Sequence, residues 1–370
     1  MTAPRPAAHA APYAAGDASG DAPPGEAPGE SPVCHLVRSV YRAPDGAVRT
    51  GLAIEEIAAL LAPGGACAPD AGAGAGALWV AIDAQDPARE RLLRTVFHFH
   101  PLAVEDTGNP KSRVKAEEYN GYLFVIVRGV RFCEETPDPY DIETLNVCGF
   151  VGPAYAVTVH AQGAPGVDAL LDDPVRAGEL LERGPARVVH AVVDAAVDAF
   201  FPVLDRVEAF ADGFEERVFV EFDESVLRDV FAVKRLVLAL KRHLGPQRDV
   251  LNVLANRPMA VLPGAAQLYF RDVYDHVLRL NDTLDAYRDL LSSTLDSYLS
   301  QVSNRLGRSS KALSTVATVT LPFVIVSGMW GMNFAHIPLS GLPHGFWLLL
   351  GAQCLLAAGL VGVLKWMRLL

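Results

Sequence analysis

The strongest constraint on the fold is a pair of long apolar segments close to the C-terminus. Residues 312–331 and residues 346–364 contain no Asp, Glu, Lys or Arg, and they are 20 and 19 residues long. A helix of about 20 apolar residues is long enough to cross the hydrocarbon core of a bilayer. Each segment is therefore predicted to be a transmembrane helix, and the chain is predicted to be an integral membrane protein.

Basic residues fix the expected orientation of these two spans. The connecting segment, residues 332–345, contains no Lys, Arg, Asp or Glu. The outer ends of the spans are flanked by Arg305, Arg308, Lys311, Lys365 and Arg368. Because Lys and Arg are enriched on the cytoplasmic side, both termini are expected in the cytoplasm and the connecting loop outside, in a cell (inner or plasma) membrane. Residues 365–370 then form a short cytoplasmic tail.

The part of the chain before the spans is predicted to be a cytoplasmic α+β domain. Residues 1–32 are rich in Ala, Pro and Gly and are expected to be a disordered tail, so the folded domain covers residues 33–262. Alternating and β-branched patterns predict a mostly antiparallel sheet with helices around it. The expected strands are 77–83, 121–128, 145–150 and 154–159, and the expected helices are 87–97, 188–222 (with a kink at Pro202) and 224–244.

One very long helix is expected to join this domain to the membrane. No proline occurs between Pro263 and Pro322, and apolar residues recur at steps of three and four from Leu280 to Leu306. A helix of about 65 residues is roughly 100 Å long, too long for a compact domain. Residues 263–331 are therefore predicted to form a stalk that continues into the first span and packs against neighbouring helices or against copies of itself.

Charge and cysteine content narrow the classes of partner. The net charge of −11 disfavours a nucleic-acid partner, which normally requires a basic face. The five cysteines have neither CxxC nor metal-ligand spacing and suit a reducing cytosol. No catalytic dyad, nucleophile elbow or nucleotide-binding loop is recognisable, so an enzyme is not expected.

The first span carries polar side chains that a lipid-facing helix would not favour. These are Ser314, Thr315, Thr318, Thr320 and Ser327. Pore lining and helix–helix packing are both consistent with them. Two spans in one chain cannot enclose a pore, so a pore would require several subunits around an axis.

The tripeptide Gly331-Met332-Asn333 follows the first span directly. A ring of Asn333 amides, one from each subunit, would offer hard oxygen ligands to a hydrated Mg²⁺ ion. A helix terminus capped by Gly and Asn is the simpler interpretation, and the residues alone do not separate the two.

These segments resemble the CorA family of magnesium transporters. The family signature is this Gly-Met-Asn tripeptide between two C-terminal spans. Residues 311–323 (Lys-Ala-Leu-Ser-Thr-Val-Ala-Thr-Val-Thr-Leu-Pro-Phe) and 327–334 (Ser-Gly-Met-Trp-Gly-Met-Asn-Phe) are similar to family segments, as are 100–106, 269–276, 295–300 and 304–306. The likeness covers roughly residues 75–370.

The resemblance implies a homopentamer with a funnel-shaped cytoplasmic domain, surrounded by membrane lipids in its spanning part. Its activity would be uptake of Mg²⁺, and of Co²⁺ or Ni²⁺, driven by the membrane potential. By matching positions, Gly331, Met332 and Asn333 would form the selectivity filter, and Asp106 and Asp272 would bind regulatory intracellular Mg²⁺ between subunits. The matching pore line consists of Leu313, Ala317, Leu321, Val324, Gly328 and Asn333.

Some features depart from this family pattern or leave alternatives open. The outer loop lacks the acidic residue of many members, and it contains His336 and His344. These histidines either favour softer metals such as Zn²⁺, Co²⁺ or Ni²⁺ or are loop residues at the level of the lipid headgroups, and the second interpretation is preferred. A Zn²⁺ or other transition-metal transporter and a membrane-anchored metal sensor or scaffold without transport therefore remain as alternatives. Asp106 and Asp272 are equally consistent with a solvated acidic surface.

Overall fold

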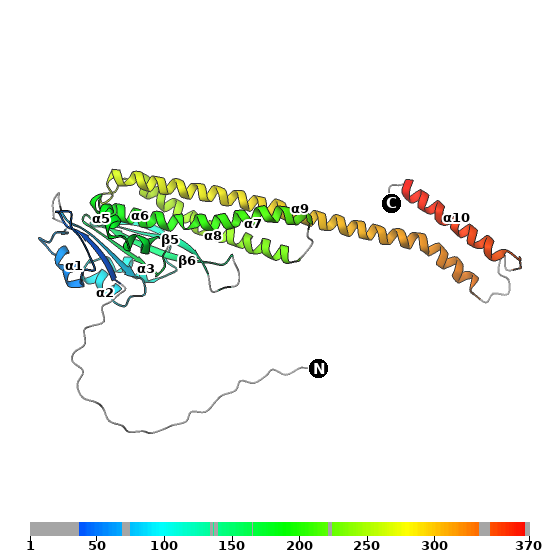
Figure 1. Cartoon of the computed structure of the whole chain (residues 1–370), viewed down its shortest axis with the longest axis horizontal. Coiled ribbons are helices and arrows are strands. Elements are labelled where there is room, and N and C mark those ends of the chain that lie inside the picture. Colours follow the sequence, from blue (N-terminus) through cyan, green and yellow to red (C-terminus); the bar gives the residue numbers. More distant parts are fainter. Residues whose placement is uncertain are drawn as a thin grey trace, which may run out of the picture. The chain divides into compact units, whose positions relative to one another are not determined.

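The structure, a computed structural model, describes residues 37–68, 75–133, 136, 140–164, 166–220, 224–332 and 341–366, without the side chains of 215–220 and 224–226. The tail predicted for residues 1–32 lies outside this part of the chain. The strands are β1 (Val37–Arg42), β2 (Val48–Thr50), β3 (Ala77–Asp83), β4 (Lys115–Tyr119), β5 (Tyr122–Phe132), β6 (Ile142–Val151) and β7 (Tyr155–His160). The helices are α1 (Ile54–Leu61), α2 (Arg89–Thr95), α3 (Pro101–Gly108), α4 (Val167–Leu171), α5 (Pro174–Glu182), α6 (Pro185–Asp198), α7 (Phe200–Val220), α8 (Glu224–Asn256), α9 (Gly264–Trp330) and α10 (Gly345–Trp366) (Figure 1).

The strands form one seven-stranded sheet in the order β2-β1-β3-β7-β6-β5-β4. Every neighbouring pair is antiparallel except β3 and β7, which run parallel. The parallel pair arises because the chain leaves β3, builds α2, α3 and the β4–β6 meander, and returns beside β3. The prediction of a mostly antiparallel sheet with helices around it is confirmed.

The two faces of the sheet bury different residues of the same strands. In β3, Leu78, Val80 and Ile82 join a core cluster with residues of α1, α2 and α3. The alternating residues Trp79 and Ala81 join the larger cluster formed with α4 to α9. This period of two is the direct result of strand geometry, in which successive side chains point to opposite faces. Helices therefore cover both faces of the sheet.

Two helix boundaries differ from the sequence prediction. The chain breaks between α6 and α7 at Ala199, and Pro202 lies in the first turn of α7, where a proline is tolerated, so it causes no kink. Helix α8 continues past the expected end at Leu244 to Asn256, although Pro246 lies inside it. Buried residues on both sides of the proline, such as Leu244 and Leu251, pack in the main core, and this tertiary packing outweighs the cost of the proline.

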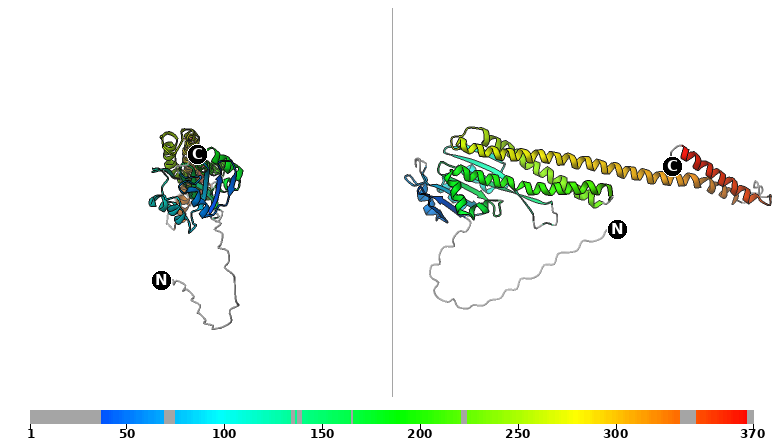
Figure 2. Two further views of the ribbon diagram at one scale, coloured as in Figure 1. Left: turned by 90° about the vertical axis from the view of Figure 1, so that its left-hand side faces the viewer. Right: turned by 45° about the horizontal axis from the view of Figure 1, so that its top comes forward.

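Helix α9 is the 67-residue helix that the apolar periodicity predicts. Its first part packs beside α6, α7 and α8, as both views of the ribbon show (Figure 2). The side chains of this stripe that are buried within one chain are Ala266, Phe270, Val273, Val277, Leu280, Leu284, Leu291 and Tyr298. The stripe therefore meets neighbouring helices of the same chain, and it becomes exposed by Leu306, which is 67% exposed.

Candidate functional site

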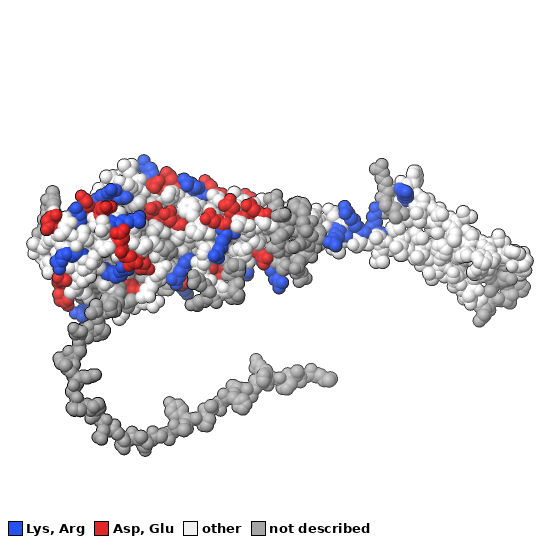
Figure 3. Space-filling view, viewed as in Figure 1, with Lys and Arg blue, Asp and Glu red and all other residues white. Residues whose placement is uncertain are grey.

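The C-terminal part of the chain contains two helices long and apolar enough to cross a membrane, α9 and α10. Charged residues gather on the sheet and the helices packed around it, whereas the far end of α9 and most of α10 carry none (Figure 3). Lys and Arg appear at the boundary, where Arg305, Arg308 and Lys311 precede the uncharged part of α9. This is the distribution expected of a soluble domain joined to a membrane-spanning hairpin.

The proposed pore residues share one face of α9. At about 100° per residue, positions 313, 317, 321, 324 and 328 fall within an arc of about 80°. Leu313, Leu321 and Val324 are 73%, 59% and 66% exposed, and Ala317 and Gly328 are also exposed. Nothing in the described part of this chain covers that face.

Helix α10 covers the other side of α9. The half-buried positions of this part of α9 include Val319 and Val326, which lie about 180–200° from the centre of the exposed arc. Helices α9 and α10 contact each other, and Gln353 of α10 is 8% exposed. The second span therefore packs on the back of the first and leaves the predicted pore face free.

The three threonine hydroxyl groups of the first span donate hydrogen bonds within their own helix. Thr315 Oγ1 donates to the carbonyl of Lys311 at 2.9 Å, and Thr318 Oγ1 donates to that of Ser314 at 2.8 Å. Thr320 Oγ1 donates to the carbonyl of Val316 at 2.8 Å. These bonds to the preceding turn allow threonine in an apolar helix without a water-filled path. The threonines are therefore weak support for a pore.

The structure describes only the first two residues of the Gly-Met-Asn tripeptide. Gly331 caps α9 with φ −79° and donates its N–H to Ser327 O at 3.0 Å. Its conformation is right-handed, so a left-handed glycine cap is absent at this position. Met332 is 51% exposed. Asn333 and His336 lie outside the described residues, and the filter remains a prediction.

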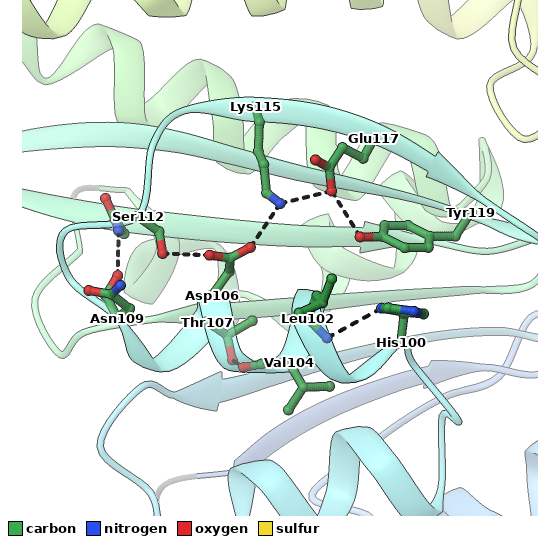
Figure 4. A network of polar contacts seen from close by, with 11 residues as sticks. His100, Leu102, Val104, Asp106, Thr107, Asn109, Ser112, Lys115, Glu117 and Tyr119 are labelled. Carbon is green, nitrogen blue, oxygen red and sulfur yellow. Dashed lines mark hydrogen bonds and ion pairs between the residues drawn. The ribbon is translucent and has the colours of Figure 1, made fainter.

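Asp106, predicted to bind regulatory Mg²⁺, belongs to a polar network between α3 and β4 (Figure 4). Its Oδ2 lies 2.8 Å from Lys115 Nζ, and its Oδ1 accepts a hydrogen bond from Ser112 Oγ at 2.8 Å. Lys115 Nζ is also 2.8 Å from Glu117 Oε2, which accepts from the Tyr119 hydroxyl at 2.8 Å. Asp106 therefore differs from the unpaired carboxylate that the regulatory scheme expects.

The electrostatics of this network favour the charged forms of Lys115 and Glu117. Partial burial acts to lower the pKa of Lys115, but its hydrogen bonds to Asp106 and Glu117 outweigh burial and raise it. The hydrogen bond from Lys115 lowers the pKa of Glu117. Burial, followed by the Glu117 carboxylate, raises the pKa of Tyr119 to about 12. A cation approaching Asp106 would therefore compete with an ammonium group held in place.

Asp272, the second predicted regulatory residue, is exposed on α9 and forms no ion pair within the described ranges. It lies on a different element from Asp106, and no contact joins the two in the described part of the chain. The single chain therefore does not bring them together.

A further group of potential metal ligands lies close to Asp272. Ligand atoms of Asp194, Asp198 and His276 are within 4.8 Å of one another. His276 Nδ1 is 3.6 Å from Asp198 Oδ1 and 3.9 Å from Asp194 Oδ1. The buried atoms Asp194 Oδ1 and His276 Nδ1 have no hydrogen-bond partner. Burial, and then the neighbouring Asp198 carboxylate, raise the pKa of Asp194. A bound dication would give Asp194 Oδ1 and His276 Nδ1 a ligand partner, and its positive charge would lower the raised pKa of Asp194.

Comparison with known proteins identifies the chain. Residues 74–365 match the model of a family described as "CorA-like Mg2+ transporter protein". The chain belongs to this family. It is therefore a membrane protein of a family of divalent cation transporters, and this family is not one of enzymes.

Individual relatives of the CorA family agree with this assignment. YfjQ of Bacillus subtilis is 31% identical over 288 residues, which cover 78% of this chain and 87% of YfjQ. The cobalt/magnesium transport protein CorA of Thermotoga maritima is 28% identical over 275 residues, 73% of this chain and 76% of that protein. The complete structure of the CorA magnesium transporter from Methanocaldococcus jannaschii has the same fold, with a TM-score of 0.72 at 17% identity, over 88% of this chain and 97% of that one.

The group of Asp194, Asp198 and His276 was not predicted from the sequence of this CorA-family chain. The sequence does contain two spacings from which the group could have been suspected. Asp194 and Asp198 are four residues apart, which places them on one face of a helix, and His276 follows Asp272 at the same spacing. The sequence does not reveal that the two helices cross with these faces together.

Proposed function

We propose that the chain forms a homopentameric channel for Mg²⁺ uptake, with the first span of each subunit lining the pore. The spans are residues 312–331 and 346–364, both termini lie in the cytoplasm and residues 332–345 face outside. Ions enter past a ring of Asn333 amides, which hold the hydrated ion through its waters, because Mg²⁺ gives up its waters reluctantly. Leu321 and Leu313 form apolar constrictions below, which gate by dewetting.

The membrane potential supplies the driving force in this proposal. A doubly charged ion gains about 4.6 kcal/mol per 100 mV of inside-negative potential, from about 2.3 kcal/mol per charge. No nucleotide hydrolysis is needed for uptake.

The observation that carries the proposal is the position of α10. The predicted pore line lies on the exposed side of α9, which also carries Val316, Ile325 and Met329. Helix α10 of the same chain contacts α9, whose half-buried positions lie opposite this line. Apolar residues on that face must contact either lipid or other subunits. A ring of subunits in which α9 is inside and α10 is outside brings these faces together around one axis.

Intracellular Mg²⁺ closes the channel by binding between subunits. Asp106 and Asp272 are the proposed ligands, and Asp194, Asp198 and His276 extend the acidic face beside Asp272. When the ions leave, Asp106 pairs with Lys115, while Asp272 and the acidic face beside it lose their counter-charge. Repulsion among these carboxylates then loosens the interface and opens the pore.

Flux into proteoliposomes that contain the purified chain tests the proposal. Mg²⁺ influx should be fast with no internal Mg²⁺ and should fall as internal Mg²⁺ is raised. Asn333→Ala should abolish most of the influx, whereas Asn304→Ala, outside the proposed pore line, should preserve it. Absence of Mg²⁺ flux, or full flux through Asn333→Ala, would instead favour a metal sensor without transport.

One observation favours a second candidate, transport or sensing of a transition metal. His276 supplies an imidazole nitrogen beside two carboxylates. This donor set suits Zn²⁺, Co²⁺ or Ni²⁺ better than it suits Mg²⁺. Competition decides between the two. If Zn²⁺ or Co²⁺ enters faster than Mg²⁺ at equal concentration, the second candidate is correct.

A further inference from the structure

A cavity of about 300 Å³ lies at the cytoplasmic start of α9 and shares no lining residue with the predicted pore or with the proposed cation ligands. The turn between α5 and α6, the turn between β6 and β7 and the start of α9 meet around it. Its lining includes Arg183, Gly184, Arg187, Pro263, Ala266 and Tyr269. Its volume reaches the lower end of the range of about 300–1,000 Å³ typical of small-molecule sites.

The charged side chains of this cavity are both cationic. Arg183 and Arg187 line it, and no Asp or Glu is among its described lining residues. Neither arginine forms an ion pair within the part of the chain that the structure describes. Two guanidinium groups and no carboxylate therefore line the described wall of the cavity, and the carboxylate of Asp194 acts on Arg187 from outside this lining.

Arg187 is held in a fixed position at the cavity wall. Its guanidinium carbon lies 3.3 Å from the ring centroid of Tyr269, and Nη1 lies 3.2 Å from His190 Nδ1. Its Nε is buried and has no hydrogen-bond partner. Burial, and to a smaller extent the nearby Arg183, lower the pKa of Arg187, while Tyr269 and Asp194 act in the opposite direction. The guanidinium group of Arg187 is therefore held in place at the cavity wall by Tyr269 and His190.

Two helices also begin at this cavity. The N-cap residues are Gly184 for α6 and Pro263 for α9, and neither provides a side-chain cap. Neither helix has an acidic residue in its first turn. A helix N-terminus carries about half a positive charge and favours a nearby anion. The two helix ends therefore add to the positive potential of the two arginines, and neither first turn contains a carboxylate that would reduce this potential.

We propose that this cavity binds a phosphate-bearing small anion. The guanidinium groups match phosphate oxygens in geometry and charge, and the helix N-termini favour the same ligand. Inorganic phosphate and a small phosphate ester share this chemistry. The inference concerns a site for anions and does not depend on which cation the protein transports.

Calorimetric titration of the full-length protein in detergent, without divalent cations, tests the inference. Sodium phosphate, sodium pyrophosphate and adenosine monophosphate serve as probes in separate titrations. We expect saturable binding of at least one probe with one site per chain. Equal affinity for phosphate and the monophosphate ester would assign recognition to the phosphate group alone, and tighter binding of the ester would add contacts to its remainder.

Three variants make the titration specific. Arg183→Gln changes an exposed residue without an ion pair, so it should fold normally and weaken binding about tenfold or more, the loss of one charge-assisted hydrogen bond. Arg187→Gln should weaken binding at least as much. Arg176→Gln, which removes an exposed arginine of α5 outside the cavity, should leave binding unchanged. Absence of saturable binding for all three probes, or unchanged affinity in Arg183→Gln, overturns the proposal.

Discussion

His190 occupies a position that accepts only its neutral form. Its side chain lies between Arg187 Nη1, 3.2 Å from Nδ1, and the carbonyl of Tyr269, 3.1 Å from Nε2. An arginine can only donate hydrogen bonds, so Nδ1 must accept and the proton must sit on Nε2. Burial, and then the charge of Arg187, lower the pKa of His190 to about 4.

This lowered pKa makes stability depend on pH. Between about pH 6.5 and pH 4 the unfolded chain binds a proton at this position and the folded chain does not. The contribution of the neutral His190 to the free energy of unfolding is therefore complete above about pH 6.5. As the pH falls from 6.5 towards 4, the free energy of unfolding decreases by on the order of 3 kcal/mol. His190→Gln, which keeps both hydrogen bonds without titrating, should show a flatter fall of the thermal midpoint across this window. Parallel curves for the two proteins would contradict the assignment.

Lys115 should set the sensitivity of the proposed regulatory site. It pairs with Asp106, so a regulatory cation must displace it. Lys115→Met is expected to lower several-fold the internal Mg²⁺ concentration that half-inhibits influx, and Asp106→Asn should raise it. Lys111→Met, at an exposed lysine nearby, is the matched control and should change neither value. Reduced Mg²⁺ sensitivity in Lys115→Met would show that the lysine supports the site.

At the scale of elements, the cytoplasmic part of α9 has a buried side and an exposed side. Leu284 is 1% exposed in the main core, whereas Leu268 on the same helix is 63% exposed. Leu284→Ala should lower the free energy of unfolding by about 2–5 kcal/mol, because it leaves a cavity. Leu268→Ala should lower the free energy of unfolding far less, because Leu268 is exposed within one chain. Chemical denaturation in detergent measures both, and equal losses would place Leu268 in an interface between subunits.

The exposed face of the membrane part of α9 is testable by thiol labelling. With Cys354→Ala as background, Leu321→Cys should react with a cationic methanethiosulfonate reagent and block Mg²⁺ influx. Val326→Cys, on the side that α10 covers, should not respond. Reaction of Val326→Cys and not of Leu321→Cys would reverse the assignment of pore and back.

Sequence patterns predicted the elements best where one strong periodicity dominates. The pattern of residues 77–83 predicted strand β3 with its bounds. The apolar stripe predicted the long helix α9 to within one or two residues. The path of α8 through Pro246 was missed, because local propensity disfavours a proline that tertiary packing tolerates. The pairing of Asp106 with Lys115 and the approach of His276 to Asp194 depend on how distant segments meet, which no local pattern encodes.

At the scale of the whole molecule, the proposal requires five chains. Native mass spectrometry of the purified protein should give a complex of about 198 kDa, five times the 39.6 kDa of one chain. Leu313, Leu321 and Val324 are exposed within one chain, and assembly would remove them from lipid. A monomer, or any other stoichiometry, in mild detergent would contradict the pentamer.

Helix α9 is continuous from His276 to Leu313, so a small tilt at its cytoplasmic end would become a larger displacement at its membrane end. The 37 residues between these positions correspond to about 55 Å along the axis at 1.5 Å per residue. Over that length a tilt of one degree displaces the far end by about 1 Å, which would change the width of the apolar constriction proposed at Leu313. Movements too small to disturb the packing of the sheet would thus be magnified before they reach the bilayer.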